Sequence, residues 1–247
     1  MPKYVYTDIS KMKNGFILIS IIALIAGYLI GNLSASPEIR VIPASYISQA
    51  TINLPAIDQD GNGVATPLKV ELRTGNGKVL TNIDKLLFWI DTQYSIQTSK
   101  SVAESYTGIE ADKFDLTYTI EGGNVTLIEG PSAGAALTIA TIAALQNKTL
   151  RPNVMITGTI NPDGTIGQVG SIIEKATAAK ETGATIFLVP SGESVLTYLK
   201  PEENCTTLGT FYYCRTEYKE VSLNVEKETG IKVVEVSNIN QAISYFL

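Results

Sequence analysis

The sequence of 247 residues contains no histidine. Without an imidazole, a Ser-His-Asp triad, a Cys-His pair and a histidine-ligated metal site are all excluded. Any general base must therefore be a lysine, an aspartate, a glutamate, a tyrosine or a chain terminus. The sequence predicts neither a metal site nor a bound cofactor.

Cysteine is almost as scarce, since Cys205 and Cys214 are the only two. Two thiolates are too few for a four-cysteine zinc site. They flank a glycine-containing segment whose ends a hairpin could bring together, and a disulfide would persist there only in an oxidising compartment. The sequence leaves open whether the two cysteines form a disulfide or remain free thiols.

Motifs for nucleotides, calcium and nucleic acids are also missing. The net charge of -5, without a dense Lys/Arg cluster, excludes the phosphate neutralisation on which nucleic-acid binding depends. The segment GNGK at 75–78 is no Walker A motif, because Leu72 replaces its first glycine. The segment DQDGNG at 58–63 begins like an EF-hand loop, but Lys69 replaces the final glutamate, so we expect a turn.

An apolar run without charge covers Gly15–Leu33, 19 residues. About 20 apolar residues cross a bilayer as a helix. Lysines outnumber acids before this run, which keeps the N-terminus in the cytoplasm. We expect a cytoplasmic tail (1–14), a single transmembrane helix (15–33), a linker (34–46) and an extracytoplasmic domain (47–247) at the cell membrane. The alternative is a signal peptide cleaved near the small residues 34–36.

Beyond the linker, predicted strands and helices alternate, which indicates an α/β or α+β domain with a mixed sheet and flanking helices. The clearest elements are a helix over 92–106, an alternating strand over 113–120 and an Ala/Ile/Leu-rich helix over 132–146. The Thr-Gly-Asn-Gly at 74–77 predicts a hairpin turn between two neighbouring strands.

The segment IEGPSAGAAL at 128–137 places Ser132 where a helix begins. Serine is a common helix cap, but amides at a helix start can also stabilise an oxyanion beside a nucleophilic serine. Gly130 and Gly134 would let a peptide backbone approach closely. Without histidine, a buried lysine can deprotonate a serine. Lys175 and Lys180 both lie at the margin of a predicted apolar helix face, and periodicity does not choose between them.

Four short motifs carry a resemblance to a known family: EGPSAG, MITG, GSIIEKATAA and ATIFLVP, in this order. Together they resemble the proteolytic domain of Lon proteases, and the resemblance covers about residues 47–247. It implies that Ser132 is the nucleophile and Lys175 its base. It also gives supporting roles to Thr157, which would orient the lysine, and to Glu129, which would shape the site. The blander alternatives are a buried strand threonine and a carboxylate bonded to turn amides.

The resemblance implies a serine endopeptidase that cleaves unfolded or flexible polypeptides. The uncharged run at 15–33 adds the membrane anchor, and the lack of a Walker A motif predicts cleavage independent of ATP. By the same resemblance the chain would form a hexameric ring. The segment 198–230 is longer than its counterpart in the family, as a local insertion would make it. The alternative function is a catalytically silent Lon-like scaffold or peptide-binding sensor at the cell surface.

Overall fold

A computed structural model of the protein describes residues 21–25, 28, 46–82, 87–88, 90–120, 127–128 and 130–247. The chain divides into two compact units, Met1–Pro43 and Ala44–Leu247. In the first unit the described residues are helical. No helix among the described residues is long and apolar enough to cross a membrane. The predicted tail, most of the predicted membrane segment and nearly all of the linker lie outside the described residues.

The second unit begins with a long antiparallel hairpin of β1 (Tyr46–Ile57) and β2 (Gly63–Thr74). Along β2, buried residues alternate with half-buried ones, as in a strand with one face on the core. The turn between the strands is closed by the Asp58 carboxylate, which accepts hydrogen bonds from the backbone amides of Asp60 and Asn62. The turn expected at 58–63 is confirmed.

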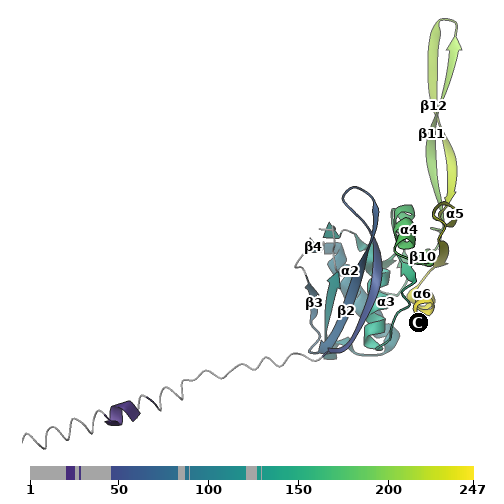
Figure 1. Ribbon diagram of the computed structural model, residues 1–247. Coiled ribbons are helices and arrows are strands. Elements are labelled where there is room, and N and C mark those ends of the chain that lie inside the picture. Colours follow the sequence, from purple (N-terminus) through teal and green to yellow (C-terminus); the bar gives the residue numbers. More distant parts are fainter. Residues whose placement is uncertain are drawn as a thin grey trace, which may run out of the picture. The chain divides into compact units, whose positions relative to one another are not determined.

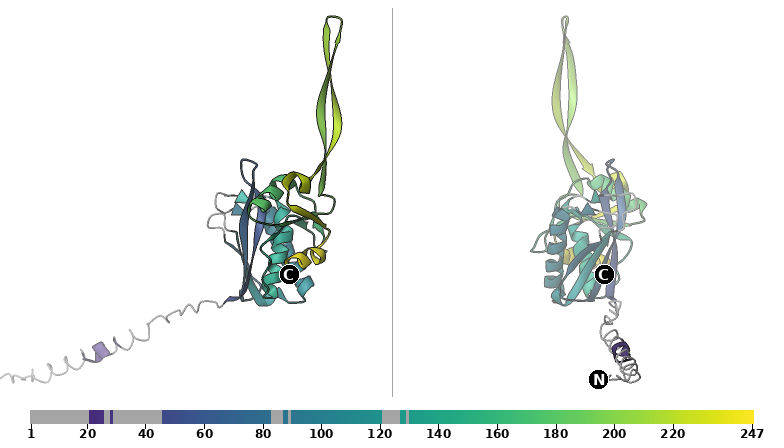
Figure 2. Two further views of the ribbon diagram at one scale, coloured as in Figure 1. Left: turned by 45° about the vertical axis from the view of Figure 1, so that its right-hand side comes forward. Right: turned by 90° about the vertical axis from the view of Figure 1, so that its left-hand side faces the viewer.

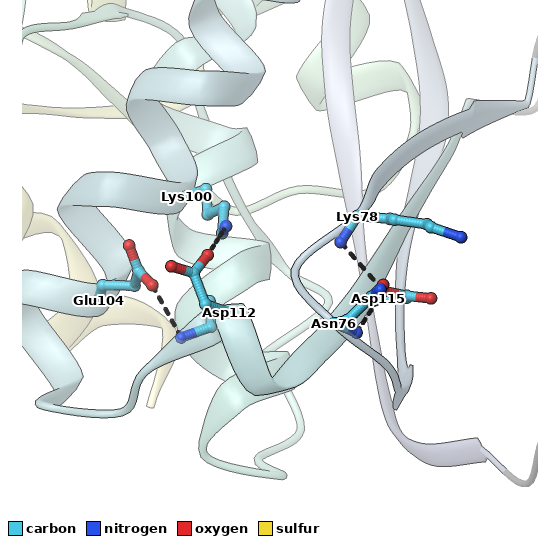
Figure 3. Close-up of polar contacts among 7 residues, drawn as sticks. Asn76, Lys78, Lys100, Glu104, Asp112 and Asp115 are labelled. Carbon is cyan, nitrogen blue, oxygen red and sulfur yellow. Dashed lines mark hydrogen bonds and ion pairs between the residues drawn. The ribbon is translucent and has the colours of Figure 1, made fainter.

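The sheet continues in the order β1-β2-β5-β3, with β5 at Phe114–Ile120 and β3 at Val79–Asn82. The predicted hairpin between β2 and β3 is wrong, because β5 lies between them and pairs with β3 in parallel. The Asp115 carboxylate accepts hydrogen bonds from the amides of Asn76 and Lys78, so it holds the connecting turn against β5 (Figure 3). A residue distant in sequence therefore decides the path of this turn.

The helix that precedes β5 makes side-chain contacts with the segment that connects it to β5. This helix, α2, spans Ile90–Thr107 and confirms the helix expected over 92–106. Lys100 forms an ion pair with Asp112, and the Glu104 carboxylate accepts a hydrogen bond from the Ala111 amide (Figure 3). These contacts fix the angle at which the chain leaves α2 and enters β5.

A second sheet contains three parallel strands in the order β13-β10-β7, at Lys232–Val236, Ile186–Pro190 and Val154–Ile156. Helix α4 (Ile172–Glu181) lies in the crossover from β7 to β10, as parallel neighbours require. Its apolar face packs in a core cluster with strand residues such as Phe187 and Val189. The mixture of sheets with flanking helices confirms the predicted α/β class.

Helix α3 (Gly134–Leu145) forms the centre of the domain, and every one of its residues is buried. It contacts β1, β2, α2 and α6 (Ile239–Phe246), so layers enclose it on several sides (Figure 1). A helix that is apolar all round is stable only in such a position. The expected helix over 132–146 is therefore present, but its first turn is a 3-10 turn at Pro131–Ala133.

Two long strands leave the body of this unit as an exposed hairpin (Figures 1 and 2). They are β11 (Val195–Leu208) and β12 (Phe211–Asn224), and among the described strands each pairs with the other alone. Cys205 and Cys214 face each other across the ladder and form a disulfide. The short helix α5 (Val225–Thr229) then returns the chain to β13. The minor strand pairs are β4 (Leu87–Phe88) with β6 (Leu127–Ile128) and β8 (Thr159–Ile160) with β9 (Ile166–Gly167).

Candidate active site

Ser132 lies in the middle of the 3-10 turn that leads into α3 and is half-buried. It does not cap α3, because the cap position is occupied by Ala133 and no side chain accepts a hydrogen bond there. Gly130, just before the turn, has a φ of 84°, a conformation that residues with a side chain rarely adopt. The chain therefore bends sharply into the turn and leaves the Ser132 hydroxyl outside the helix.

The backbone on either side of Ser132 is held by the segment that follows β7. The Gly158 amide donates to the Ser132 carbonyl at 3.0 Å, and the Ala135 amide donates to the Gly158 carbonyl at 3.0 Å. Gly134 allows this close approach, because a Cβ at that position would lie 2.8 Å from the backbone nitrogen of Ile160. The glycines of the motif thus serve the bend and the packing of the turn.

Thr157 joins the same group of contacts. Its side chain is fully buried, and its hydroxyl donates to the Ser132 carbonyl at 3.4 Å. The family resemblance implies that this threonine orients the lysine, whereas the hydrogen bond seen here orients the backbone of the serine. Glu129, the other predicted supporting residue, lies outside the described residues.

Lys175 lies on the first turn of α4 and is only 5% exposed. Its Nζ donates a hydrogen bond to the Gly170 carbonyl at 2.9 Å. Burial lowers the pKa of this amine, although the carboxylates of Glu193 and Glu174 oppose the shift. A lysine whose pKa is lowered can be neutral when it is required to accept a proton.

The structure separates the two candidate lysines. Lys180 is exposed, and its Nζ donates to the Thr229 carbonyl at 2.7 Å, near the opposite end of α4. Lys175 instead shares a cavity with Ser132. The tertiary structure thus brings the predicted serine and Lys175 together and leaves Lys180 elsewhere.

The shared cavity has a volume of about 420 Å³. Ser132, Ala133, Ser171 and Lys175 line one part of it, and residues 54–59 from the end of β1 and its turn line the other. Because β1 is the edge strand of its sheet, an extended peptide could lie beside it and reach Ser132. Among the described residues, no group of three or more metal-ligating side chains lies together.

Sequence reasoning missed Glu193, a buried acid in the turn after β10. Its carboxylate accepts the Val169 amide at 3.1 Å, and the adjacent Gly170 carbonyl is the acceptor for Lys175. Burial raises the pKa of Glu193, while the Val169 amide and the Lys175 charge lower it. In the sequence, a glutamate in Pro-Ser-Gly-Glu resembles an ordinary turn residue, so nothing local distinguished it.

A comparison with known protein families identifies a stretch of the chain that contains the candidate site. Residues 90–202 match the model of the Lon protease (S16) C-terminal proteolytic domain. This match includes Ser132, Thr157, Lys175 and Glu193 and ends inside β11. The tip of the long hairpin thus lies beyond the matched residues.

Individual proteins that resemble the chain are also Lon proteases. The chain is 29% identical over 138 residues to the Lon protease of Mycoplasma genitalium, which covers 52% of the chain and 16% of that relative. It is 32% identical over 126 residues to the Lon protease of Phenylobacterium zucineum, covering 51% and 16%. The archaeal Lon protease of Thermococcus kodakarensis is 26% identical over 113 residues, covering 44% and 17%. The chain therefore spans less than a fifth of the length of these relatives.

Proposed function

Because this chain contains a Lon protease-like proteolytic domain, we propose that it is a serine endopeptidase in which Lys175 deprotonates Ser132. The observation that carries the proposal is the shared cavity, which holds a serine free of any capping role and a buried lysine. A catalytically silent scaffold would gain nothing from burying an amine there at the cost of its solvation.

The reaction would proceed in two halves. The neutral Lys175 amine accepts the Ser132 hydroxyl proton while Oγ bonds to the peptide carbonyl carbon. The C–N bond then breaks, the leaving amine takes the proton from Lys175, and an ester remains on Ser132. Water, deprotonated by the same amine, hydrolyses this ester and restores both side chains.

The oxyanion would be held by amides of the 3-10 turn. The Gly134 amide already donates to the Pro131 carbonyl, and the Ala135 amide donates to Gly158. The amides beside the nucleophile in this turn are those of Ser132 and Ala133, since proline has none. They precede α3, whose dipole adds positive potential at its N-terminal end.

The substrate would be an extended, unfolded or flexible polypeptide lying along the free edge of β1. Pairing through the backbone gives affinity that is nearly independent of sequence, while residues 54–59 set whatever preference exists. A folded protein cannot present such a strand, because its backbone groups are already paired.

Four further predictions belong to this proposal. Cleavage without ATP rests on the absence of a Walker A motif from the printed sequence. Membrane attachment rests on the uncharged run at 15–33. An extracytoplasmic position is supported by the Cys205–Cys214 disulfide, which is typical of oxidising compartments. Assembly into a homo-oligomeric ring remains a prediction from the resemblance.

Covalent labelling tests the assignment of the nucleophile directly. A fluorophosphonate probe should form one adduct on the intact chain, which peptide mapping should place on Ser132. Unfolded casein, added without ATP, should be cleaved by the same preparation and should compete with the probe. An adduct on another serine, or cleavage that persists after complete labelling, would contradict the proposal.

Replacement of Glu193 by glutamine is expected to shift the pH dependence of cleavage. The Glu193 carboxylate raises the pKa of Lys175, so removing its charge lowers that pKa further. The neutral amine is then populated at lower pH, and the acid limb of kcat/KM should move to lower pH. Glutamine can still accept the Val169 amide, so the loop should keep its position.

Glu174→Gln is the matched control, because Glu174 is exposed on α4 and water screens its charge. It should shift the acid limb less than Glu193→Gln does. Equal shifts in the two variants, or no shift in Glu193→Gln, would refute the role assigned to Glu193.

A further inference from the structure

The long hairpin is the largest feature of the domain that the proposed catalysis does not use. We call residues 195–224 the arm and residues 205–214 its tip. Each strand of the arm has 14 residues, and about 3.3 Å per residue gives a reach of roughly 45 Å. The arm leaves the body without a covering layer (Figures 1 and 2). Because an isolated two-stranded hairpin is marginally stable in water, this length calls for a reason.

Charge divides the arm into two parts. Between the body and the tip, both strands carry acidic and basic side chains, with ion pairs such as Lys219 to Glu202. The tip, CTTLGTFYYC, carries no charge. The disulfide between Cys205 and Cys214 marks the boundary and closes the tip into a constrained loop.

The tip exposes three consecutive aromatic side chains to water. Phe211 is 77% exposed, Tyr212 73% and Tyr213 62%. Successive residues of a strand point to opposite faces, so Tyr212 projects from one face and Phe211 and Tyr213 from the other. The tip therefore carries aromatic rings on both of its faces. Lipid can surround such a tip, whereas a flat protein surface would cover only one face.

The area of the three exposed aromatic side chains also distinguishes a lipid partner from a protein partner. Three aromatic side chains exposed to this degree offer roughly 400 Å². A stable protein interface needs about 800 Å² from each partner. A lipid interface makes no such demand, and it favours tyrosine, whose ring is apolar and whose hydroxyl remains hydrated.

We propose that the tip of the arm inserts into the headgroup region of a lipid bilayer. The Cys205–Cys214 disulfide holds the loop closed, and the charged part of the arm stays in water. Such a contact is weak alone, but it is effective for a chain that a second signal already attaches to the membrane. In this respect the inference rests on the proposed attachment through residues 15–33.

Tryptophan fluorescence in vesicles tests the inference on the full chain. The single native tryptophan, Trp89, is replaced by phenylalanine, and one reporter is introduced at a time. Tyr212→Trp reports on the tip, Leu24→Trp on the uncharged N-terminal run, and Tyr218→Trp on the charged part of the arm. Each variant is reconstituted into phosphatidylcholine vesicles with or without brominated acyl chains, which quench tryptophan only on contact.

We expect brominated lipid to quench Tyr212→Trp by at least about half of the fraction seen for Leu24→Trp, as its shallower position in the bilayer implies. Tyr218→Trp should stay unquenched. If Leu24→Trp is quenched and Tyr212→Trp is not, the inference is overturned while membrane attachment stands. If Tyr212→Trp alone is quenched, the inference stands and attachment through 15–33 fails. If neither is quenched, both fail.

A blue-shifted but unquenched Tyr212→Trp would mean that the tip contacts protein, such as a second copy of the chain, and would also overturn the inference. Should the chain fail to fold without Trp89, the reporters can be measured with Trp89 retained. The signal of the parent chain is then subtracted, and the same quenching criteria apply.

Discussion

Replacement of Lys175 by arginine is expected to lower kcat/KM for peptide cleavage by about 100- to 10,000-fold, the range that the loss of a general base produces. Arginine keeps the positive charge and much of the length, but it cannot become neutral in a protein. The variant thus separates the role of the amine as a base from the role of its charge. The measurement is hydrolysis of unfolded casein or of a fluorogenic peptide across a pH series.

Lys175→Met should lose the same activity and yet unfold at higher temperature than the parent. The side chain is buried, and burial lowers the pKa of the amine, so the charged form destabilises the folded state. Methionine has a similar shape without the charge, and we expect a gain of about 1 to 2 kcal/mol in the free energy of unfolding near neutral pH.

The pH dependence of that gain has a definite sign. Between the lowered pKa of folded Lys175 and the ordinary lysine pKa of 10.5, the unfolded parent binds more protons than the folded parent. The stability of the parent therefore rises with pH through this window. The advantage of Lys175→Met should be largest below the window and should shrink toward pH 10.5. A constant difference would show that packing, and not charge, causes it.

Ser132→Ala provides the matched control for both lysine variants. It should abolish cleavage, but it removes only one hydroxyl from a half-buried position and should leave the unfolding temperature nearly unchanged. Lys175→Arg that retains substantial activity would refute the proposed dyad, even if Ser132→Ala is inactive.

Replacement of Phe187 by alanine is expected to lower the free energy of unfolding by about 3 to 5 kcal/mol, the usual cost of removing a buried aromatic ring. Phe187 lies on β10, is fully buried, and packs in the cluster that holds the apolar face of α4. Because Lys175 lies on that helix, cleavage should also fall at temperatures where the chain is still folded. Chemical denaturation and activity on the same samples measure both effects.

Phe211→Ala is the matched control, since it removes the same ring from the exposed tip of the arm. Its effect on the free energy of unfolding should lie within about 0.5 kcal/mol. Casein cleavage in solution should not change either. If Phe187→Ala and Phe211→Ala destabilise the chain equally, the cluster around α4 does not have the role assigned to it here.

The sequence by itself identified the elements whose signals are local. The helix at α2 and the strand at β5 were predicted because periods of 3.6 and 2 residues are visible within one segment. The absence of histidine limited the chemistry before any fold was known. The order of the short motifs resembles that of the Lon proteolytic domain, and residues 90–202 match the model of that domain.

Strand pairing was beyond the sequence, because it depends on contacts between distant segments. The turn at 74–77 resembles a hairpin turn locally, but β5 inserts between β2 and β3 and Asp115 binds the turn from the other side. The pairing of Cys205 with Cys214 was left open for the same reason. The opposing register of two long strands settled it.

At the candidate site the division is equally clear. The sequence determined the candidates for the nucleophile and its base: one serine at a helix start and two lysines on the margin of one helix face. Periodicity did not distinguish the lysines, and the family resemblance favoured Lys175. The tertiary structure gives the physical difference, since it buries Lys175 in the cavity of Ser132 and leaves Lys180 exposed. It also revealed Glu193 and the position of β1 at the edge of its sheet. Burial and electrostatic coupling are properties of several segments in contact, so no single stretch of sequence displays them.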